Sequence, residues 1–209
     1  IRGANFRELF LDGLRLVHEV YGSGATRVVG FKDVWTTEFV PGFLETFPNA
    51  RAVCLIRDPR AVYLSKRNQK ERYPLLFMAR QWRKLAAFAW LWSRDQALSD
   101  RVLIVRYEDL VSNPEESAVR MAEFIGIENP SSMTDPESWM DGGGEVWKQN
   151  TSFGEGASGF DVKAADRWRT QLPEVEARLI ESLCAPEMSL FGYTTLSEPW
   201  SRSSTEIMK

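Results

Sequence analysis

The sequence predicts an α/β fold in which a parallel sheet is flanked by helices. Three short apolar runs, at residues 27–31, 51–56 and 101–107, have the composition of strands, and longer segments with helical periodicity separate them. Strands that alternate with helices form βαβ units, whose strands run parallel. Each run also ends in charged residues, and ligands of such sheets bind beyond the carboxyl ends of the strands. The functional site is therefore expected at these strand ends.

The composition predicts one globular domain, residues 1–209, and excludes several classes of function. Hydrophobic residues make up 44% of the chain, enough for one sizeable core, and no apolar stretch is long enough to span a membrane. The net charge of -3 argues against a nucleic-acid partner, which requires a basic face. One histidine and two distant cysteines, Cys54 and Cys184, predict neither a metal site nor a disulfide framework.

The first helix is predicted to begin after Asn5, an N-cap residue with Glu8 three positions later, and to stop at Gly22. Its apolar residues share one face, so the helix is amphipathic, and His18 lies on that side in a structural role. After strand 27–31, a helix is expected from Thr36 or Thr37, with a late start or a kink at Pro41.

Strand 51–56 contains no polar interruption and is expected to be covered on both faces. Pro59 suits the first turn of the helix that follows it, and a long helix is expected from residue 75. After the third strand, a capped helix should end at Gly126. The remaining segments are a loop at 129–160, rich in Gly, Ser, Pro, Asp and Asn, and two helical patterns at about 161–171 and 173–190.

The end of strand 51–56 suggests half of a phosphate site. Arg57 offers a planar fork that suits a phosphate, and Ser65, two turns into the next helix, can add a hydroxyl donor. The alternative is an arginine that caps the strand and pairs with Asp58. The residues alone leave both interpretations open.

Several motifs then occur in an order that resembles the sulfotransferases that use 3′-phosphoadenosine 5′-phosphosulfate (PAPS), especially the branch that modifies carbohydrate hydroxyls. They are "LIRDPRAVYLSKR", "VRYEDLVSNPEESAVRMAEFIGI" and "NTSF…DRWRTQLP…CAPEMSLFGY", and the resemblance covers residues 26–194. It implies a P-loop-NTPase-like parallel sheet. It also implies transfer of a sulfuryl group from PAPS to a hydroxyl of a glycan or other small acceptor, with adenosine 3′,5′-bisphosphate (PAP) as product and no metal.

The resemblance also implies roles for single residues. Arg57 and Ser65 hold the 3′-phosphate of the nucleotide, and Tyr107 lies near the adenine, whereas Glu108 turns the strand into the next helix. A segment near the C-terminus closes over the nucleotide. Its candidate contacts are Ser152, Lys163 and Arg167.

The catalytic candidates are Lys32 and Asp33. By resemblance Lys32 faces the 5′-phosphosulfate, where a cation would stabilise the charge that develops on the bridging oxygen; the alternative is a solvated lysine at a strand end. Transfer to a hydroxyl also needs a general base. The histidine of the cytosolic branch is replaced by Val34, so Asp33 is the nearest carboxylate, and it is either this base or a partner for Lys32. In other branches a glutamate further upstream is the base, which would be Glu8 or a residue before this chain.

One family element is missing from the sequence. In the family, a Gly/Ser/Thr-rich loop follows the first strand and wraps the 5′-phosphosulfate. Residues 22–26 have a similar composition, but they precede a predicted strand and are therefore interpreted as a turn. We therefore expect the first strand and that loop upstream of Ile1. The alternatives are a P-loop kinase, weakened because no Gly-x-x-x-x-Gly-Lys-Ser/Thr motif occurs, and a nucleotide-binding relic without catalysis. The expected compartment is the cytoplasm, or the Golgi lumen if a membrane anchor lies upstream.

The sequence gives weaker evidence about the acceptor. Tryptophans of the helix from residue 75 have helical spacing and are expected in the core. Trp35, Trp139 or Trp147, in loops, could instead stack on a sugar or another flat acceptor.

Overall fold

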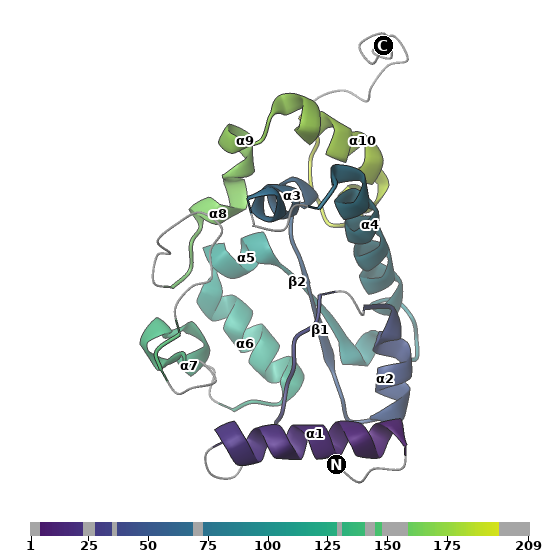
Figure 1. Ribbon diagram of the computed structural model, residues 1–209, viewed down its shortest axis with the longest axis vertical. Coiled ribbons are helices and arrows are strands. Elements are labelled where there is room, and N and C mark those ends of the chain that lie inside the picture. The colour runs from purple at the N-terminus through teal and green to yellow at the C-terminus, as the bar shows by residue number, and fades with distance from the viewer. Residues whose placement is uncertain are drawn as a thin grey trace.

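The computed structural model describes residues 5–22, 28–34, 37–68, 73–128, 131–140, 145–147 and 159–196. Its centre is a parallel pair of strands, β1 (Ala52–Ile56) and β2 (Val102–Arg106). Two helices, α3 (Pro59–Arg67) and α4 (Leu75–Trp92), connect the strands. The predicted α/β class, with a parallel sheet flanked by helices, is confirmed (Figure 1).

The other helices surround this pair. In Figure 1, α5 and α6 lie on one side of the strands, α4 lies on the other, and α10 packs against α3 and α4. Their bounds are α1 Phe6–Tyr21, α2 Val40–Thr46, α5 Tyr107–Ser112, α6 Pro114–Ile125, α7 Ser131–Thr134, α8 Lys163–Asp166, α9 Trp168–Gln171 and α10 Glu174–Leu190. Short 3-10 turns occur at Thr37–Phe39, Ser99–Arg101 and Pro136–Ser138.

Helix boundaries follow local chemistry. The side chain of Asn5 accepts a hydrogen bond from the Glu8 N–H at 3.0 Å and caps α1, as predicted. Asp58 caps α3 in the same way, with Pro59 at its first position. Gly126 ends α6 at φ 79°, a left-handed conformation that suits glycine.

The prediction of a strand at 27–31 is wrong for the residues that the structure describes there. Residues 28–34 form no strand, and the side chains of Val28 and Val29 are 47% and 52% exposed. The ring of Phe31 instead contacts Phe10 and Phe43, with centroids 5.3 and 5.4 Å away. A β-branched run becomes a strand only where a neighbouring strand can accept its hydrogen bonds, so composition alone is misleading here.

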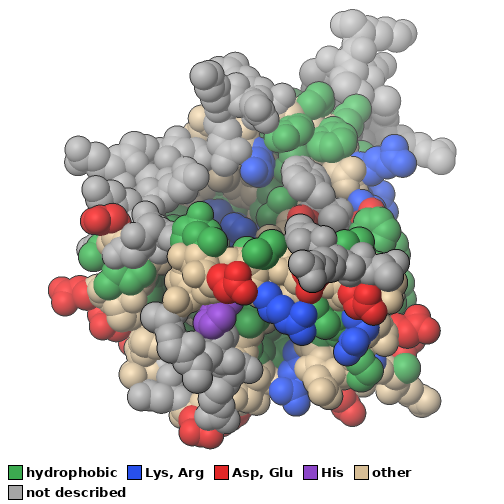
Figure 2. Space-filling view, turned by 60° about the horizontal axis from the view of Figure 1, so that its bottom comes forward, with side chains coloured by type: hydrophobic (Ala, Val, Ile, Leu, Met, Phe, Trp, Pro, Cys, Tyr) green, Lys and Arg blue, Asp and Glu red, His purple; other side chains and the backbone are tan. Residues whose placement is uncertain are grey.

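One prediction of burial is also wrong. Val53 and Leu55 of β1 are 40% and 53% exposed, so the strand is covered on one face only, because alternate residues of a strand point to opposite faces. Helix α1 contains no fully buried residue, but Phe10 on its apolar face packs against Phe31 and Phe43. Figure 2 looks onto the side of the molecule where α1 lies, and hydrophobic side chains are visible there among charged ones.

The main core lies where α3, α4, α9 and α10 meet the end of β1. Its largest fully buried apolar side chains include Trp168, Ile180 and Met188. Trp82 of α4 is 6% exposed and confirms that tryptophans of this helix belong to the core. A smaller cluster around Leu44 packs α2 against the start of β2.

Both cysteines are free thiols in the packed interior. Burial raises the pKa of Cys54 to about 11 and that of Cys184 to about 12, so both remain protonated near neutral pH.

One charged cluster is buried within the core. Arg60 is 1% exposed, and its Nε and Nη2 atoms donate hydrogen bonds to the carboxylate of Asp58 at 2.9 and 2.6 Å. Its Nη1 atom donates to Glu181 of α10, and its guanidinium lies 3.7 Å from the ring centroid of Trp168. The cluster ties the turn after β1 to α10 and α9.

We predict that Arg60→Ala destabilises the protein by about 3–5 kcal/mol, because two buried carboxylates would lose their counter-charge. The matched control is Arg83→Ala. Arg83 forms a two-point ion pair with Glu187, but its side chain is 44% exposed, so the expected loss is below about 1 kcal/mol. Urea unfolding of both variants measures the difference, and equal losses would contradict the proposed importance of the buried cluster.

Candidate functional site

The strand register brings two predicted site residues together. Ile56 of β1 pairs with Arg106 of β2, so Arg57 and Tyr107 leave the sheet side by side. The guanidinium of Arg57 lies 4.2 Å from the ring centroid of Tyr107, within the range of a cation–π contact. These two candidate residues therefore lie together at the carboxyl edge of the sheet.

Arg57 is fixed at one end and has a free donor at the other. Its Nη2 atom donates to the carbonyl oxygen of Ala164 at 2.5 Å. Its Nε atom is buried and has no hydrogen-bond partner among the described residues. A buried N–H group without an acceptor is costly, and an anion would satisfy it with a charge-assisted hydrogen bond. This arrangement suits an anion that approaches the guanidinium.

The segment from residue 159 to α9 lies beside this arginine. The Arg167 Nη2 atom donates to Asp161 at 2.6 Å, and α8 contacts both α3 and α5. Burial raises the pKa of Tyr107, the guanidinium of Arg57 opposes the shift, and Asp161 adds to it. The structure thus brings Arg167, and the helix that contains the exposed Lys163, next to Arg57 and Tyr107.

The two remaining nucleotide candidates differ in what the structure describes. Ser65 lies on α3 and is half-buried, and its hydroxyl makes no hydrogen bond to any other residue in the described part of the chain. It is available to a ligand. Ser152 lies outside the described residues.

Lys32 and Asp33 lie beside a different group of residues. Both are exposed in the irregular segment 28–34, next to Phe31, which packs against α1 and α2. Asp33 is close enough to Glu38 to act on the pKa of that carboxyl, which a backbone hydrogen bond and Lys84 hold below its ordinary value. Lys84 donates to Glu38 at 3.0 Å. The strand end on which the Lys32 assignment rested is therefore absent, and the catalytic roles of both residues remain predictions.

The loop tryptophans form a packing cluster where they are described. The ring of Trp139 lies 6.0 Å from that of Trp147 and 5.4 Å from that of Phe160, and its Nε1 atom donates to the Ser132 carbonyl at 3.1 Å. Trp139 thus already has aromatic neighbours, and Trp35 lies outside the described residues.

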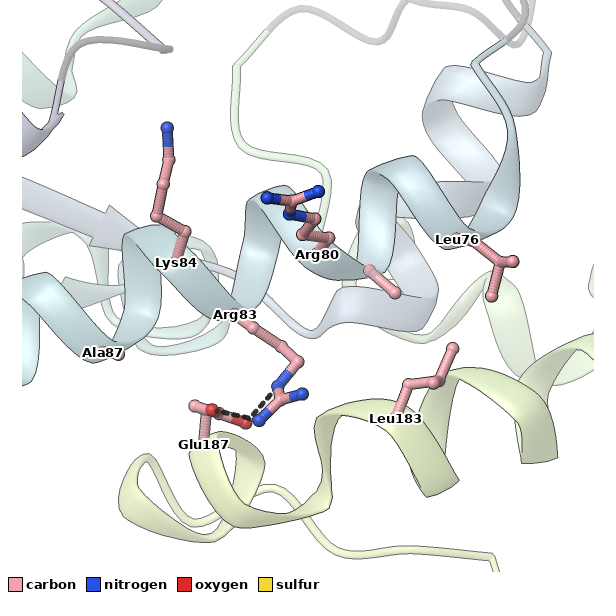
Figure 3. Close-up of a pocket in the computed structure, with 8 residues that line it drawn as sticks. Leu76, Arg80, Arg83, Lys84, Ala87, Leu183 and Glu187 are labelled. Carbon is pink, nitrogen blue, oxygen red and sulfur yellow. Dashed lines mark hydrogen bonds and ion pairs between the residues drawn. The ribbon is translucent and has the colours of Figure 1, made fainter.

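A separate shallow groove of about 320 Å³ lies between α4 and α10 (Figure 3). Leu76 and Leu183 line it together with three cations. Two of these cations are paired, Arg83 with Glu187 and Lys84 with Glu38, whereas Arg80 points away from Glu187. Little net positive charge remains in this groove, which makes it a weaker candidate for an anion site than the sheet edge at Arg57.

The described residues lack two other features, a metal-binding cluster and a membrane-spanning helix. No three His, Cys, Asp or Glu side chains gather there in a way that could hold a metal ion. None of the helices in these parts of the chain combines the length and the hydropathy needed to cross a bilayer.

The chain is similar to proteins of a known family. The model of a family described as "Sulfotransferase family" matches residues 5–131. The chain belongs to the sulfotransferase family. The resemblance to PAPS-using sulfotransferases of the carbohydrate branch is thereby confirmed at the level of the family. The matched range contains Arg57, Ser65 and Tyr107.

Individual relatives support this membership. Carbohydrate sulfotransferase 3 of Tetronarce californica is 28% identical over 185 residues, which are 77% of this chain and 40% of that protein. Carbohydrate sulfotransferase 2 of Mus musculus is 31% identical over 49% of this chain and 19% of its own length. The protein-tyrosine sulfotransferase of Drosophila melanogaster is 25% identical over 86% of this chain and 37% of its own length. The chain thus spans less than half of each.

A solved structure supports the fold. The sulfotransferase domain from the curacin biosynthetic pathway aligns with a TM-score of 0.52 over 77% of this chain and 61% of that domain, at 20% identity. This likeness shows a sulfotransferase-type α/β fold.

The sequence interpretation did not identify the residues that hold the backbone at Arg57 and Asp58. The Nε1 atom of Trp82 donates to the Arg57 carbonyl at 2.8 Å, and the Asp58 N–H donates to Glu108 at 2.9 Å. The Tyr193 hydroxyl donates to the same carboxylate at 2.8 Å. The only local signal was the position of Glu108 directly after Tyr107.

Proposed function

We propose that this sulfotransferase binds PAPS at the carboxyl ends of β1 and β2 and transfers its sulfuryl group to a hydroxyl of a glycan. The observation that carries the proposal is Arg57, which stacks on Tyr107 and has a buried Nε donor that meets no acceptor among the residues the structure describes. A guanidinium in this state fits a phosphate group, and an adjacent aromatic ring fits a base.

The candidate residues that the structure describes would contact different parts of the nucleotide. Arg57 and the free hydroxyl of Ser65 would hold the 3′-phosphate, and Tyr107 would lie near the adenine. Arg167 is kept close by its ion pair with Asp161. These contacts are the same before and during the reaction, so they contribute mainly to binding of the donor.

The reaction itself needs further groups. The bond between sulfur and the bridging oxygen breaks, the acceptor oxygen bonds to sulfur, and the acceptor proton passes to a base. Lys32 is our candidate for stabilising the leaving phosphate oxygen, and Asp33 or a glutamate further upstream is the candidate base.

A glycan acceptor is favoured because carbohydrate sulfotransferases are among the relatives with the largest identity. A tyrosine hydroxyl is the alternative, since protein-tyrosine sulfotransferases also match. Both acceptors are hydroxyl groups, so the donor site proposed here is the same in either case.

The first prediction concerns the 3′-phosphate. At about a hundredfold excess over its Kd, PAP should stabilise the protein by about 2.7 kcal/mol, equivalent to roughly 5–10 °C in melting temperature. Adenosine 5′-monophosphate should give a much smaller shift, and Arg57→Ala should abolish the difference between the two nucleotides. Thermal unfolding measures both, with Arg83→Ala in the groove between α4 and α10 as control. Equal shifts by the two nucleotides in the unaltered protein would refute the 3′-phosphate assignment.

The second prediction concerns the phosphosulfate loop. Phosphate oxygens are commonly held by backbone N–H groups of a loop at a helix N-terminus, and the sequence contains no such loop after a strand. We expect the 209-residue chain to bind PAP but to transfer little sulfate from PAPS, and an upstream extension that adds the loop to restore transfer. Equal turnover by the short and the extended chain would overturn this expectation. Binding without turnover in both would favour a non-catalytic nucleotide-binding protein.

The third prediction tests Lys32 in the extended chain. If its ammonium group stabilises charge that develops during transfer, Lys32→Ala should lower kcat by roughly 10² while the affinity for PAP changes little. Lys84→Ala is the matched control, because Lys84 is paired with Glu38 in the neighbouring cluster. A near-normal kcat for Lys32→Ala would show that Lys32 is a solvated lysine without a catalytic role.

A further inference from the structure

The peptide group that joins Arg57 to Asp58 is held from both sides. Its carbonyl oxygen accepts a hydrogen bond from Trp82 Nε1 at 2.8 Å. Its N–H group donates to Glu108 Oε1 at 2.9 Å. Because both polar groups of one planar peptide are fixed, the orientation of the chain directly after Arg57 is fixed as well. This peptide lies between the strand that delivers Arg57 and the N-terminus of α3.

The second oxygen of Glu108 is also in use. Glu108 Oε2 accepts a hydrogen bond from the Tyr193 hydroxyl at 2.8 Å, and that hydroxyl lies 3.4 Å from the Ile56 carbonyl oxygen. Tyr193 is 8% exposed. Burial, together with the negative charge of Glu108, raises the pKa of this hydroxyl, so it stays protonated and can donate. One carboxylate thus connects the turn after β1, helix α5 and the chain that follows α10.

The ring of Tyr193 is held in place by two features. Gly192 adopts φ +72°, a conformation that L side chains rarely adopt, and it turns the chain inward after α10. The guanidinium of Arg106 lies 4.7 Å from the ring centroid of Tyr193. The hydroxyl is therefore presented to Glu108 by a fixed ring.

We propose that Glu108 is a positioning residue for the donor nucleotide, which holds the Arg57–Asp58 peptide so that the Arg57 guanidinium meets the 3′-phosphate. The inference rests on the proposed function, because it assigns Glu108 a role through Arg57. Glu108 touches no reacting atom in this proposal. It acts by fixing the backbone from which the phosphate-binding side chain extends.

The hydrogen bonds of the Glu108 carboxylate identify a conservative replacement. The carboxylate offers two acceptors, one to an N–H group and one to an O–H group. Glutamine keeps one acceptor for the Asp58 N–H, and its NH₂ group can donate to the Tyr193 oxygen, whose own proton can turn to the Ile56 carbonyl. Alanine removes both contacts. Glu108→Gln should therefore preserve the position of Arg57, whereas Glu108→Ala should release it.

The experiment compares affinities for PAP and adenosine 5′-monophosphate by calorimetry, because their ratio reports recognition of the 3′-phosphate alone. We expect Glu108→Ala to lower this ratio about tenfold, since a charge-assisted contact would be weakened, and Glu108→Gln to stay within about threefold of the unaltered protein. Glu115→Ala, which removes an exposed carboxylate in the first turn of α6, is the control and should leave the ratio unchanged. In the Arg57→Ala background, Glu108→Ala should have no further effect on the ratio, because coupled residues are not additive.

The outcomes are distinguishable. If Glu108→Ala lowers the melting temperature but leaves the ratio unchanged, Glu108 is only structural and the inference is wrong. If the unaltered protein shows no preference for PAP, the proposed function fails instead. Should Glu108→Ala not fold, Tyr193→Phe provides the second test, because it removes one donor to Glu108 and keeps the ring. It should lower the ratio by about threefold, and an unchanged ratio would again contradict the inference.

Discussion

The parallel pairing of β1 with β2 is the constraint on which the rest of the structure depends. The register that opposes Ile56 and Arg106 determines that Arg57 and Tyr107 leave the sheet at the same level. A shift by one residue would move the guanidinium away from the tyrosine ring and would reverse the faces of one strand. The candidate site is therefore a consequence of strand register, and the two helices between the strands only have to return the chain to that register.

Charge is distributed unequally around the turn after β1. Arg60, three residues after Arg57, is buried and fully engaged by Asp58 and Glu181. Arg57 is engaged by a neutral carbonyl and an aromatic ring, and within the described part of the chain its Nε donor has no partner. The two arginines thus have opposite roles, because paired buried charges stabilise the turn, whereas an incompletely satisfied cation has affinity left for an external anion.

The features predicted correctly from the sequence are those that a few neighbouring residues determine. The cap at Asn5, the start of α3 at Pro59 and the end of α6 at Gly126 depend on local hydrogen bonds and backbone angles. Two expectations failed, a strand at 27–31 and burial of β1 on both faces. Each depends on which elements pack beside the segment, and composition does not encode this. The family resemblance directed attention to Arg57, but the contact between Glu108 and Tyr193 joins residues 85 positions apart and has no local signature.

The chain after α10 is attached to the turn after β1 at two points. The Tyr193 hydroxyl donates to Glu108, which also holds the Asp58 N–H, and the Leu196 N–H donates to Glu181 at 3.0 Å, which also holds Arg60. Each carboxylate thus bridges the same turn and the same C-terminal segment. Asp58 accepts from Arg60 and donates to Glu108, so both bridges meet at this residue. Displacement of the C-terminal segment would therefore weaken the contacts of both carboxylates, Glu108 and Glu181, with the turn that follows Arg57. The geometry of the candidate phosphate site is consequently coupled to docking of this segment, which lies more than a hundred residues further along the chain.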